Sequence, residues 1–342
     1  MNQKSFASDN NAPVHKAVMQ AMLDANKGDA IGYGDDIHTL AAERKFKEAF
    51  GNDIAVFFVL TGTGANVSSL AHITRPYQAI ICSDKAHLEN DECGAPEKIT
   101  GCKLLRLPSS DGKIRTEQII PLMHSVGFQH HSQPKVISIT QATELGTVYT
   151  LEEIHKIALF ANENDLYLHM DGARLANAAA SLDISLAEMT KEAGVDVLSF
   201  GGTKNGAMAA EALVFFNTGL AREYEYTRKQ TMQLLSKMRY VSAQFNALLT
   251  NELWLKNARH ANQMAGLLAE KVRQFEEVQI TQAVETNAVF ATMPAEVIEK
   301  LKRRYFFYMW DASRNEVRWM TAFNTTEQDI EDFVEALKEA LS

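Results

Sequence analysis

Short apolar runs without polar alternation recur along the first two thirds of the chain. They cover residues 54–60, 79–82, 136–139, 166–170, 195–200 and 212–216. Strands that are buried on both faces have this pattern, because none of their side chains meets water. Segments with helical periodicity lie between several of the runs, at 117–126, 151–162 and 186–193. Repeated strand and helix units of this kind predict an α/β fold with a mostly parallel sheet covered by helices.

The sequence beyond Asn217 has a different texture. It is charged and helix-favouring to about Phe275, then strand-like at 288–291 and 316–321, and helical again from Glu327. We therefore expect a large α/β domain over 31–245 and a smaller α+β domain over 246–342. Residues 1–30 form an N-terminal segment that can pack on the smaller domain.

Composition and charge narrow the classes of protein. The 342 residues leave room for about two domains, and 46% apolar with 23% charged residues is ordinary globular composition. A net charge of −9 repels phosphate backbones and anionic membranes, so neither nucleic acid nor a membrane is expected as a partner. The longest apolar stretch is far too short for a membrane span, and the first residues lack the apolar run of a signal peptide. Three cysteines without C-x-x-C spacing predict neither a disulfide framework nor a metal site, and favour the cytoplasm.

Ligands of open α/β sheets collect at the carboxyl ends of the strands, so polar residues directly after the apolar runs are candidates for a site. The run 54–60 leads into Thr61-Gly62-Thr63-Gly64-Ala65-Asn66 and then into a helical segment. Small residues with free N–H groups at a helix N-terminus are typical of an anion site, most naturally for phosphate. A plain turn between strand and helix is the alternative. The motif is not a dinucleotide fingerprint, because its third glycine would fall at Val67.

Two more strand ends carry candidate chemistry. Asp171 ends the run 166–170, and Lys204 follows the run 195–200 in the turn Gly201-Gly202-Thr203-Lys204-Asn205-Gly206. Taken alone, Asp171 could be a helix cap and Lys204 a surface lysine. Together with the anion cradle, they match the needs of pyridoxal 5′-phosphate, which requires a carboxylate on its pyridine nitrogen and a lysine for the Schiff base.

With these residues in place, the chain resembles the threonine aldolases, and most closely the low-specificity L-threonine and phenylserine aldolases. This family belongs to the aldolases and β-eliminating lyases of the aspartate-aminotransferase-like fold, fold type I. The similarity runs over nearly the whole chain, from Ser8-Asp9-Asn10 to Val317-Arg318-Trp319-Met320. It implies pyridoxal 5′-phosphate as the cofactor. Lys204 would form the Schiff base, and Asp171 would pair with the pyridinium nitrogen. Gly62, Thr63 and Gly64 would cradle the phosphate, and His87 would stack on the ring.

The resemblance also implies residues for the substrate and for a partner subunit. The α-carboxylate of an amino acid substrate would be held by Ser8, Arg174 and Arg318. Tyr33 would line the pocket, and Arg239 would reach the phosphate from a neighbouring subunit. A homo-oligomer with shared active sites, either a dimer or a homotetramer, is therefore expected.

The chain departs from the common family pattern near the substrate. Many threonine aldolases have a threonine-histidine-asparagine run where this chain has Thr143-Glu144-Leu145, so Glu144 replaces a histidine close to the substrate hydroxyl. The general base is thereby left open between His87, Glu144 and water. Glu144 could instead cap or salt-bridge in the loop before Leu151. Glu89-Asn90-Asp91 replaces the aromatic residues usual after the stacking histidine, which predicts a more acidic pocket.

These features predict a lyase of amino acid metabolism. The expected reaction is the retro-aldol cleavage of L-threonine, L-allo-threonine or phenylserine to glycine and an aldehyde. One alternative keeps the cofactor but is a β-eliminating lyase that acts on an aromatic or other β-substituted amino acid. A catalytically silent binding protein on the same fold is the alternative from another class.

Overall fold

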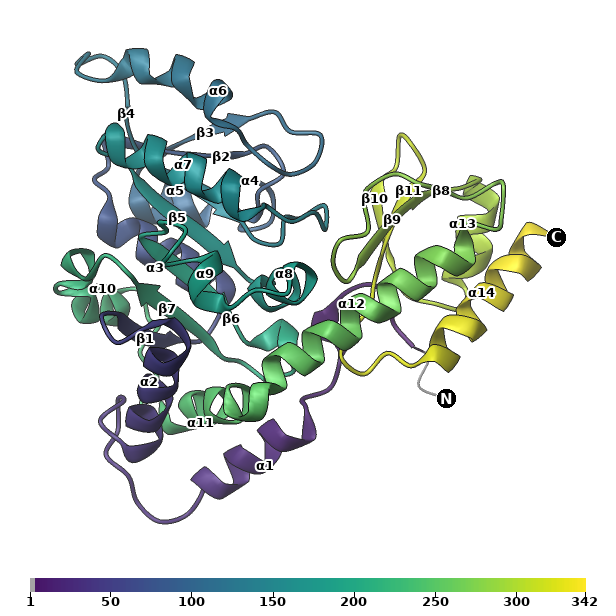
Figure 1. Ribbon diagram of the computed structural model, residues 1–342, viewed down its shortest axis with the longest axis horizontal. Helices are drawn as coiled ribbons and strands as arrows, with labels where there is room; N and C mark the ends of the chain where they lie inside the picture. Colours follow the sequence, from purple (N-terminus) through teal and green to yellow (C-terminus); the bar gives the residue numbers. More distant parts are fainter. Residues whose placement is uncertain (1–3) are drawn as a thin grey trace.

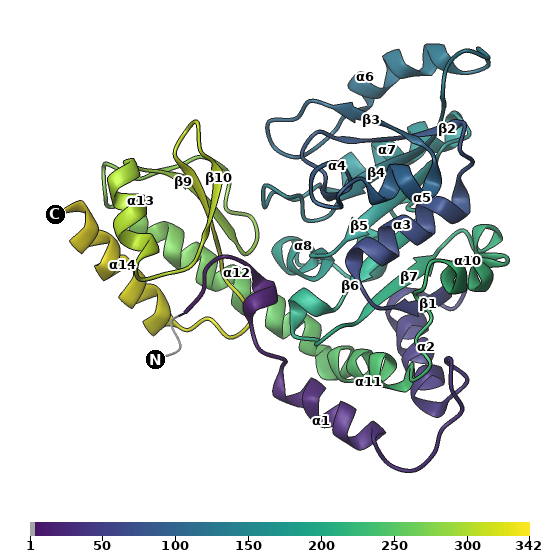
Figure 2. The same cartoon turned by 180° about the vertical axis from the view of Figure 1, so that it is seen from behind.

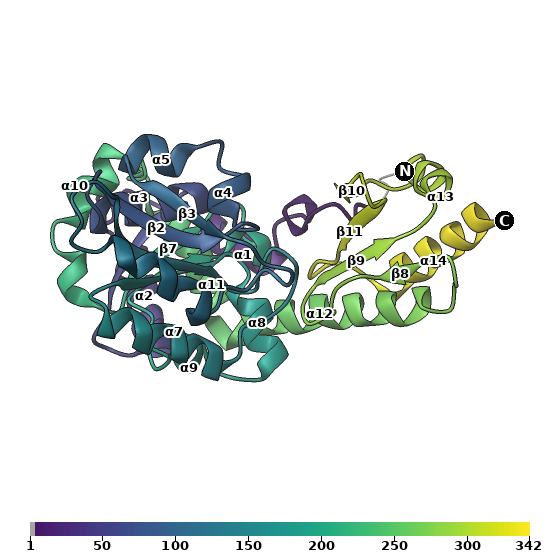
Figure 3. The same ribbon diagram turned by 90° about the horizontal axis from the view of Figure 1, so that it is seen from above.

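The computed structural model describes residues 4–342 and shows two bodies that are joined by the long helix α12 (Leu253–Val272) (Figure 1). The larger body is built on a seven-stranded sheet and the smaller one on a four-stranded sheet. Figure 3 shows the N-terminal segment running between the two bodies on one side of α12. Among the described residues, no helix is both long and apolar enough to cross a membrane.

The large sheet has the strand order β1-β7-β6-β5-β4-β2-β3. Its strands are β1 (Ala55–Val59), β2 (Gln78–Ser83), β3 (Lys103–Leu107), β4 (Gln133–Thr140), β5 (Tyr167–Gly172), β6 (Val197–Gly201) and β7 (Glu211–Phe215). β7 is antiparallel to both of its neighbours, whereas β6, β5, β4, β2 and β3 pair in parallel. The predicted α/β fold with a mostly parallel sheet is therefore confirmed.

Helices cover both faces of this sheet. α7 (Leu151–Glu163), α8 (Leu175–Leu182) and α9 (Leu186–Met189) lie on the face seen in Figure 1, and α3 (Gly62–Ile73), α5 (Ala95–Thr100) and α10 (Tyr224–Gln230) lie on the face seen in Figure 2. The remaining helices of the larger body are α1 (Lys16–Ala25), α2 (Ile37–Phe50), α4 (His87–Asn90), α6 (Thr116–Ile119) and α11 (Arg239–Leu248).

Two predicted helices are shorter than their periodicity indicates. The segment 186–193 is helical only to Met189, because Thr190 leaves helical geometry with φ −123° and ψ −83°. The segment 117–126 begins as α6 but continues as a 3-10 turn, Ile120–Ser125, that contains Pro121. Proline has no N–H to continue an α-helical hydrogen-bond ladder.

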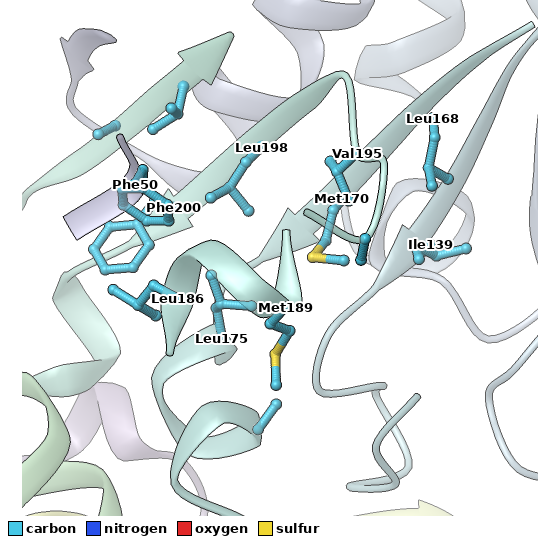
Figure 4. Close-up of a cluster of buried hydrophobic side chains, with 14 of the residues drawn as sticks. Phe50, Ile139, Leu168, Met170, Leu175, Leu186, Met189, Val195, Leu198 and Phe200 are labelled. Carbon is cyan, nitrogen blue, oxygen red and sulfur yellow. The ribbon is translucent and has the colours of Figure 1, made fainter. Parts of the chain in front are cut away.

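The core of the larger body holds the strands rigidly in place. Alternate residues of β5 and β6 point to opposite faces, so that Leu168, Met170, Leu198 and Phe200 share one apolar cluster while Val197 belongs to another. In the first cluster these side chains pack against residues of α8 and α9, which include Leu175, Leu186 and Met189 (Figure 4). Each such buried side chain stabilises the fold by roughly 1.5–3 kcal/mol. The carboxyl ends of the strands are thus anchored by a packed core.

The smaller body contains an antiparallel sheet of order β10-β11-β9-β8, formed by β8 (Gln279–Ile280), β9 (Ala288–Thr292), β10 (Tyr308–Asp311) and β11 (Glu316–Met320). It packs with α12, α13 (Ala295–Lys302) and α14 (Glu327–Leu341). Phe6 is buried in this core, and its backbone bonds to Phe306 and Met320 at 2.9 and 2.8 Å. α1 packs instead against α11 of the larger body. The residue limits given for the domains stay a prediction.

Candidate active site

Three adjoining cavities, of about 710, 350 and 40 Å³, meet at Lys204. The first lies between the two bodies, because Arg318 of β11 and Trp310 of β10 line it together with Arg174 from the larger body. The other two lie at the carboxyl ends of β5 and β6 and at the start of α3. Parallel strands end at the same edge of a sheet, which explains why residues far apart in the sequence come together here.

Lys204 lies in a one-turn 3-10 helix, Thr203–Asn205, directly after β6. Gly201 allows this turn to approach β5, since a Cβ there would lie 2.7 Å from the Ala173 backbone, and Gly206 adopts φ +103° at the end of the turn. Burial lowers the pKa of the Lys204 amine, and the nearby Arg174 charge lowers it further against the opposing effects of Asp9 and Asp171. A lysine with a lowered pKa is more often neutral and therefore nucleophilic.

Asp171 is buried near the end of β5 and lines the smallest cavity. Its Oδ2 accepts a hydrogen bond from Asn66 Nδ2 at 2.7 Å, and its Oδ1 accepts one from the Ala173 N–H at 2.9 Å. The next helix begins only at Leu175, with Arg174 at its N-cap position. Asp171 is therefore not the cap of α8, and its carboxylate is held at the cavity wall by two donors.

The predicted anion cradle at the start of α3 has one backbone N–H that is capped by a side chain and two that are free. The Thr61 hydroxyl accepts a hydrogen bond from the Gly64 N–H at 3.0 Å. Within residues 4–342, no acceptor is found for the N–H groups of Gly62 and Thr63, and both residues line the 350 Å³ cavity. Gly64 is not among the residues that line this cavity, and a Cβ there would lie 2.3 Å from the Gln233 side chain. The free donors of the cradle are thus those of Gly62 and Thr63.

His87 begins α4 and belongs to a chain of buried hydrogen bonds. Its Nδ1 lies 2.8 Å from Glu92 Oε1, and the same oxygen accepts a hydrogen bond from Asn66 Nδ2 at 3.0 Å. Asn66 also donates to Asp171, so a continuous path joins His87 to the carboxylate of β5. The hydrogen bond that His87 donates to Glu92 raises the pKa of His87.

Glu144 is placed next to His87. Its Oε1 accepts hydrogen bonds from the His87 backbone N–H at 2.7 Å and from Thr140 Oγ1 at 2.9 Å, while its Oε2 is buried without a partner. Burial, together with the charge of Asp171, raises the pKa of Glu144 to about 7. Thr150 caps the helix that follows, and Glu144 takes part in none of the ion pairs found in residues 4–342. Glu144 therefore neither caps that helix nor forms an ion pair in the described residues, and its part in proton transfer stays a prediction.

Two arginines face the largest cavity. Asp9 holds Arg174 by two hydrogen bonds, from Nε at 2.7 Å and from Nη2 at 2.9 Å. Arg318 packs over the Trp310 ring, with its guanidinium carbon 4.9 Å from the ring centroid, and its Nε is buried without a partner. Burial and the Arg174 charge lower the pKa of Arg318 to about 10. Two guanidinium groups that repel each other beside a cavity, with Ser8 on the same wall, suit a bound carboxylate.

Two residues implied by the resemblance lie outside these cavities. Tyr33 is half-exposed on the loop before α2, with the Lys229 ammonium 5.2 Å from its ring centroid. Arg239 begins α11 and donates a hydrogen bond to the Gly28 carbonyl at 3.0 Å. Neither lines the site of its own chain, so any role in catalysis requires a second copy.

Asn66, Glu92 and Asp9 belong to the site but carried no functional assignment from the sequence. Asn66 lies about one helical turn beyond Gly62, which was a signal that both face the same cavity. Glu92 lies just after Glu89-Asn90-Asp91, whose charges are also typical of a solvated surface. Its burial follows only from the fold.

The beta-eliminating lyase family profile matches residues 5–296, so the fold and the site define a lyase of this family. The low specificity L-threonine aldolase of Pseudomonas aeruginosa is 42% identical over 323 residues, which cover 94% of this chain and 93% of the relative. That of Pseudomonas sp. (strain NCIMB 10558) is 40% identical, with coverage of 99% and 98%. The solved threonine aldolase of Leishmania major is 30% identical, has a TM-score of 0.94 and covers 99% of both chains. The chain therefore belongs to the threonine aldolases within this family.

Proposed function

We propose that this chain cleaves L-β-hydroxy-α-amino acids, such as L-threonine, L-allo-threonine and phenylserine, to glycine and an aldehyde with the help of pyridoxal 5′-phosphate. The observation that carries this proposal is the convergence of Lys204, Asp171 and the Gly62–Thr63 N–H groups on adjoining cavities. The two arginines on the same cavity system supply the site for an amino acid carboxylate.

The residues present fit the cofactor. The N–H groups of Gly62 and Thr63 suit its phosphate, the Asp171 carboxylate suits its pyridine nitrogen, and the Lys204 amine suits its aldehyde. His87 lines the same cavities and can stack on the ring. When bound, pyridoxal phosphate supplies an electron sink for the bond that breaks at Cα.

The protein contributes orientation and charge. With the cofactor bound, Asp171 would keep its pyridine nitrogen protonated, and two hydrogen bonds prevent this carboxylate from turning away. Arg174, Arg318 and Ser8 would bind the α-carboxylate of the substrate and so fix the orientation of its Cα–Cβ bond. A fixed orientation favours cleavage of this one bond over the others at Cα.

Glu144→Gln tests the acceptor of the β-hydroxyl proton. If Glu144 is the base, directly or through water, it must be ionised, and its pKa of about 7 predicts that kcat/KM falls as the pH drops below about 7. The variant should lower retro-aldol turnover by roughly 10²-fold and flatten this acid limb, because an amide cannot accept the proton. pH–rate profiles of wild type, Glu144→Gln and His87→Asn on one substrate provide the measurement. Loss of the limb in the His87 variant alone would assign the base to His87.

The alternative reaction is β-elimination, which the name of the matching family itself describes. The products separate the two reactions. Retro-aldol cleavage yields glycine and an aldehyde, whereas elimination yields a 2-oxo acid and ammonia. Incubation with L-threonine, L-allo-threonine and the two phenylserine diastereomers should give glycine in equal amounts with acetaldehyde or benzaldehyde. A 2-oxo acid with ammonia would support the alternative instead.

A homo-oligomer with shared active sites is part of the same proposal. Arg239 and Tyr33 are implied in the site, yet they lie outside the cavities of their own chain. Apolar side chains are exposed in the same region, and they favour contact with a second copy: Leu23 of α1, Ile31 in the loop that follows α1, and Ile37 of α2. The dimer or tetramer stays a prediction, as does the cytoplasm, to which the three free thiols are suited.

Arg239→Ala should weaken the affinity for pyridoxal phosphate, because the arginine that a neighbour supplies to the phosphate is lost. Dilution of the wild type to monomers should have the same effect. Titration of the cofactor against both proteins, with sedimentation to establish the oligomeric state, measures this. Arg273→Ala, which removes an exposed arginine at the end of α12, is the control. Tight cofactor binding by a demonstrated monomer would show that the site is complete in one chain.

A further inference from the structure

A second buried carboxylate lines the cradle cavity and takes no part in the mechanism described above. Glu211 is the first residue of β7, where it pairs with Val59 of β1 and Gly201 of β6. Because β7 runs antiparallel to both strands, its first residue lies at the edge of the sheet where they end. Glu211 is only 7% exposed and lines the 350 Å³ cavity with Gly62 and Lys204.

Thr203 faces the Glu211 carboxylate, and its hydroxyl and backbone N–H both favour the ionised form and so lower the carboxyl pKa. Thr203 Oγ1 also accepts a hydrogen bond from the Ala210 N–H at 3.2 Å, so the hydroxyl proton is available to Glu211. None of the ion pairs in the described part of the chain includes Glu211. Such a carboxylate does not stabilise the fold, because burying a charged group without an ion-pair partner costs free energy.

The charged groups near Glu211 work in opposite directions. Burial raises its pKa to about 7, the Lys204 charge opposes this shift, and Asp171 adds to it. His87 of α4 lines the same cavity, while the start of α3 contributes hydroxyl and N–H groups. The protonation state of Glu211 is therefore sensitive to any further charge that enters the cavity.

We propose that Glu211 takes up a proton from solvent when the phosphate of the cofactor enters the cradle, so that cofactor binding is coupled to neutralisation of this side chain. The inference rests on the proposed use of pyridoxal phosphate. A phosphate dianion and an ionised, buried carboxylate in one cavity repel each other. Arg239 of a second copy would supply one positive charge against the two negative charges of the phosphate. The neutral carboxyl removes the remaining repulsion.

The direction in which the dissociation constant of the cofactor changes with pH follows from the coupling between proton uptake and binding. At a pH between the pKa of Glu211 in the cofactor-free protein and its higher pKa in the loaded protein, binding takes up one proton, so this residue raises the dissociation constant by up to about tenfold per pH unit. Titration of Lys204 also affects binding, and the Glu211 charge raises the pKa of Lys204, so the two proteins are compared with a ligand that cannot bond to Lys204 as well as with the cofactor. A difference between wild type and Glu211→Gln that is the same with both ligands isolates Glu211. The glutamine has nearly the same shape and can still accept the hydrogen bonds from Thr203.

Calorimetry of the cofactor-free protein counts the protons directly. Titrations with pyridoxal phosphate in buffers of different ionisation enthalpy give the number of protons that the protein takes up. They are done at about pH 8.5, where the phosphate is already a dianion because the second pKa of a phosphate monoester is about 6. Pyridoxine 5′-phosphate, which lacks the aldehyde that reacts with Lys204, is titrated in parallel. Glu163→Gln removes an exposed carboxylate on α7 as the control.

With both ligands, the wild type and Glu163→Gln should take up close to one proton more than Glu211→Gln. Equal proton counts in wild type and Glu211→Gln would overturn the proposal. A difference seen only with pyridoxal phosphate would also overturn it, because the proton would then belong to the reaction with Lys204.

If Glu211→Gln does not fold, infrared difference spectra of the Glu144→Gln protein replace the calorimetry. A neutral carboxyl band must then appear on ligand binding, and its absence contradicts the proposal. Failure of the proposed function would instead appear as absent cofactor binding or absent aldehyde.

Discussion

Lys204→Ala is expected to lower retro-aldol turnover by several orders of magnitude. In the proposed function its side chain supplies the amine that bonds to the cofactor aldehyde, and it lines all three cavities of the site. Glycines in its turn let it approach β5, and no other described lysine lines all three cavities. Steady-state rates, with the visible absorption band of lysine-bound cofactor as a second readout, measure the effect.

Lys302→Ala is the matched control, since it removes an exposed lysine near the end of α13. It should leave both the rate and the absorption band unchanged. Circular dichroism and thermal unfolding establish that the Lys204 variant is folded. A folded Lys204→Ala protein that keeps most of its activity and its absorption band would refute the assignment of this residue.

Asp171→Asn is expected to keep bound cofactor but to lower kcat by about 10²-fold or more. An amide cannot hold the pyridinium proton by charge pairing, whereas its volume is that of the carboxylate it replaces. Both oxygens of Asp171 accept hydrogen bonds from Asn66 and Ala173, so the amide nitrogen of the variant must also face a donor. The measurement is kcat at saturating substrate, together with the cofactor content of the purified protein.

Asp332→Asn, on the exposed side of α14, serves as the control for the loss of one carboxylate. An unchanged kcat in Asp171→Asn would reduce Asp171 to a local backbone partner of Ala173. Loss of cofactor without any change in the kcat of the remaining loaded enzyme would assign the residue to binding alone.

The hydrophobic pattern identified most of the large sheet but only part of its topology. Strands buried on both faces have an unbroken apolar run, which is why β1, β2, β4, β5, β6 and β7 were predicted. β3 was missed because it is an edge strand, with exposed Lys103 and Arg106 interrupting its apolar residues. The antiparallel direction of β7 is not encoded in its apolar residues. It follows from the short connection 202–210, which is too short for a parallel crossover.

The site was predictable where chemistry coincides with a strand end. Lys204, Asp171 and the Gly62–Thr63 turn follow from that rule, whereas His87 and the arginines were assigned only through the family resemblance. The contacts that tune these groups depend on tertiary structure. Asn66 meets Asp171 across 105 positions of sequence, and Glu92 becomes buried only once α4 packs over the sheet. Glu211 lies directly before the apolar run 212–216, so the pattern gave no reason to separate it from the loop that precedes the strand.

The most direct test of the central claim, that three strand ends form one pyridoxal phosphate site around Lys204, is to trap the cofactor on the protein. Borohydride reduction of the loaded enzyme, followed by proteolysis and mass spectrometry, locates the modified side chain. The predicted result is a single pyridoxyl group on the peptide that contains Lys204, with loss of labelling when L-threonine occupies the site during reduction. A label on another lysine, or no label on a folded protein incubated with excess cofactor, would contradict it.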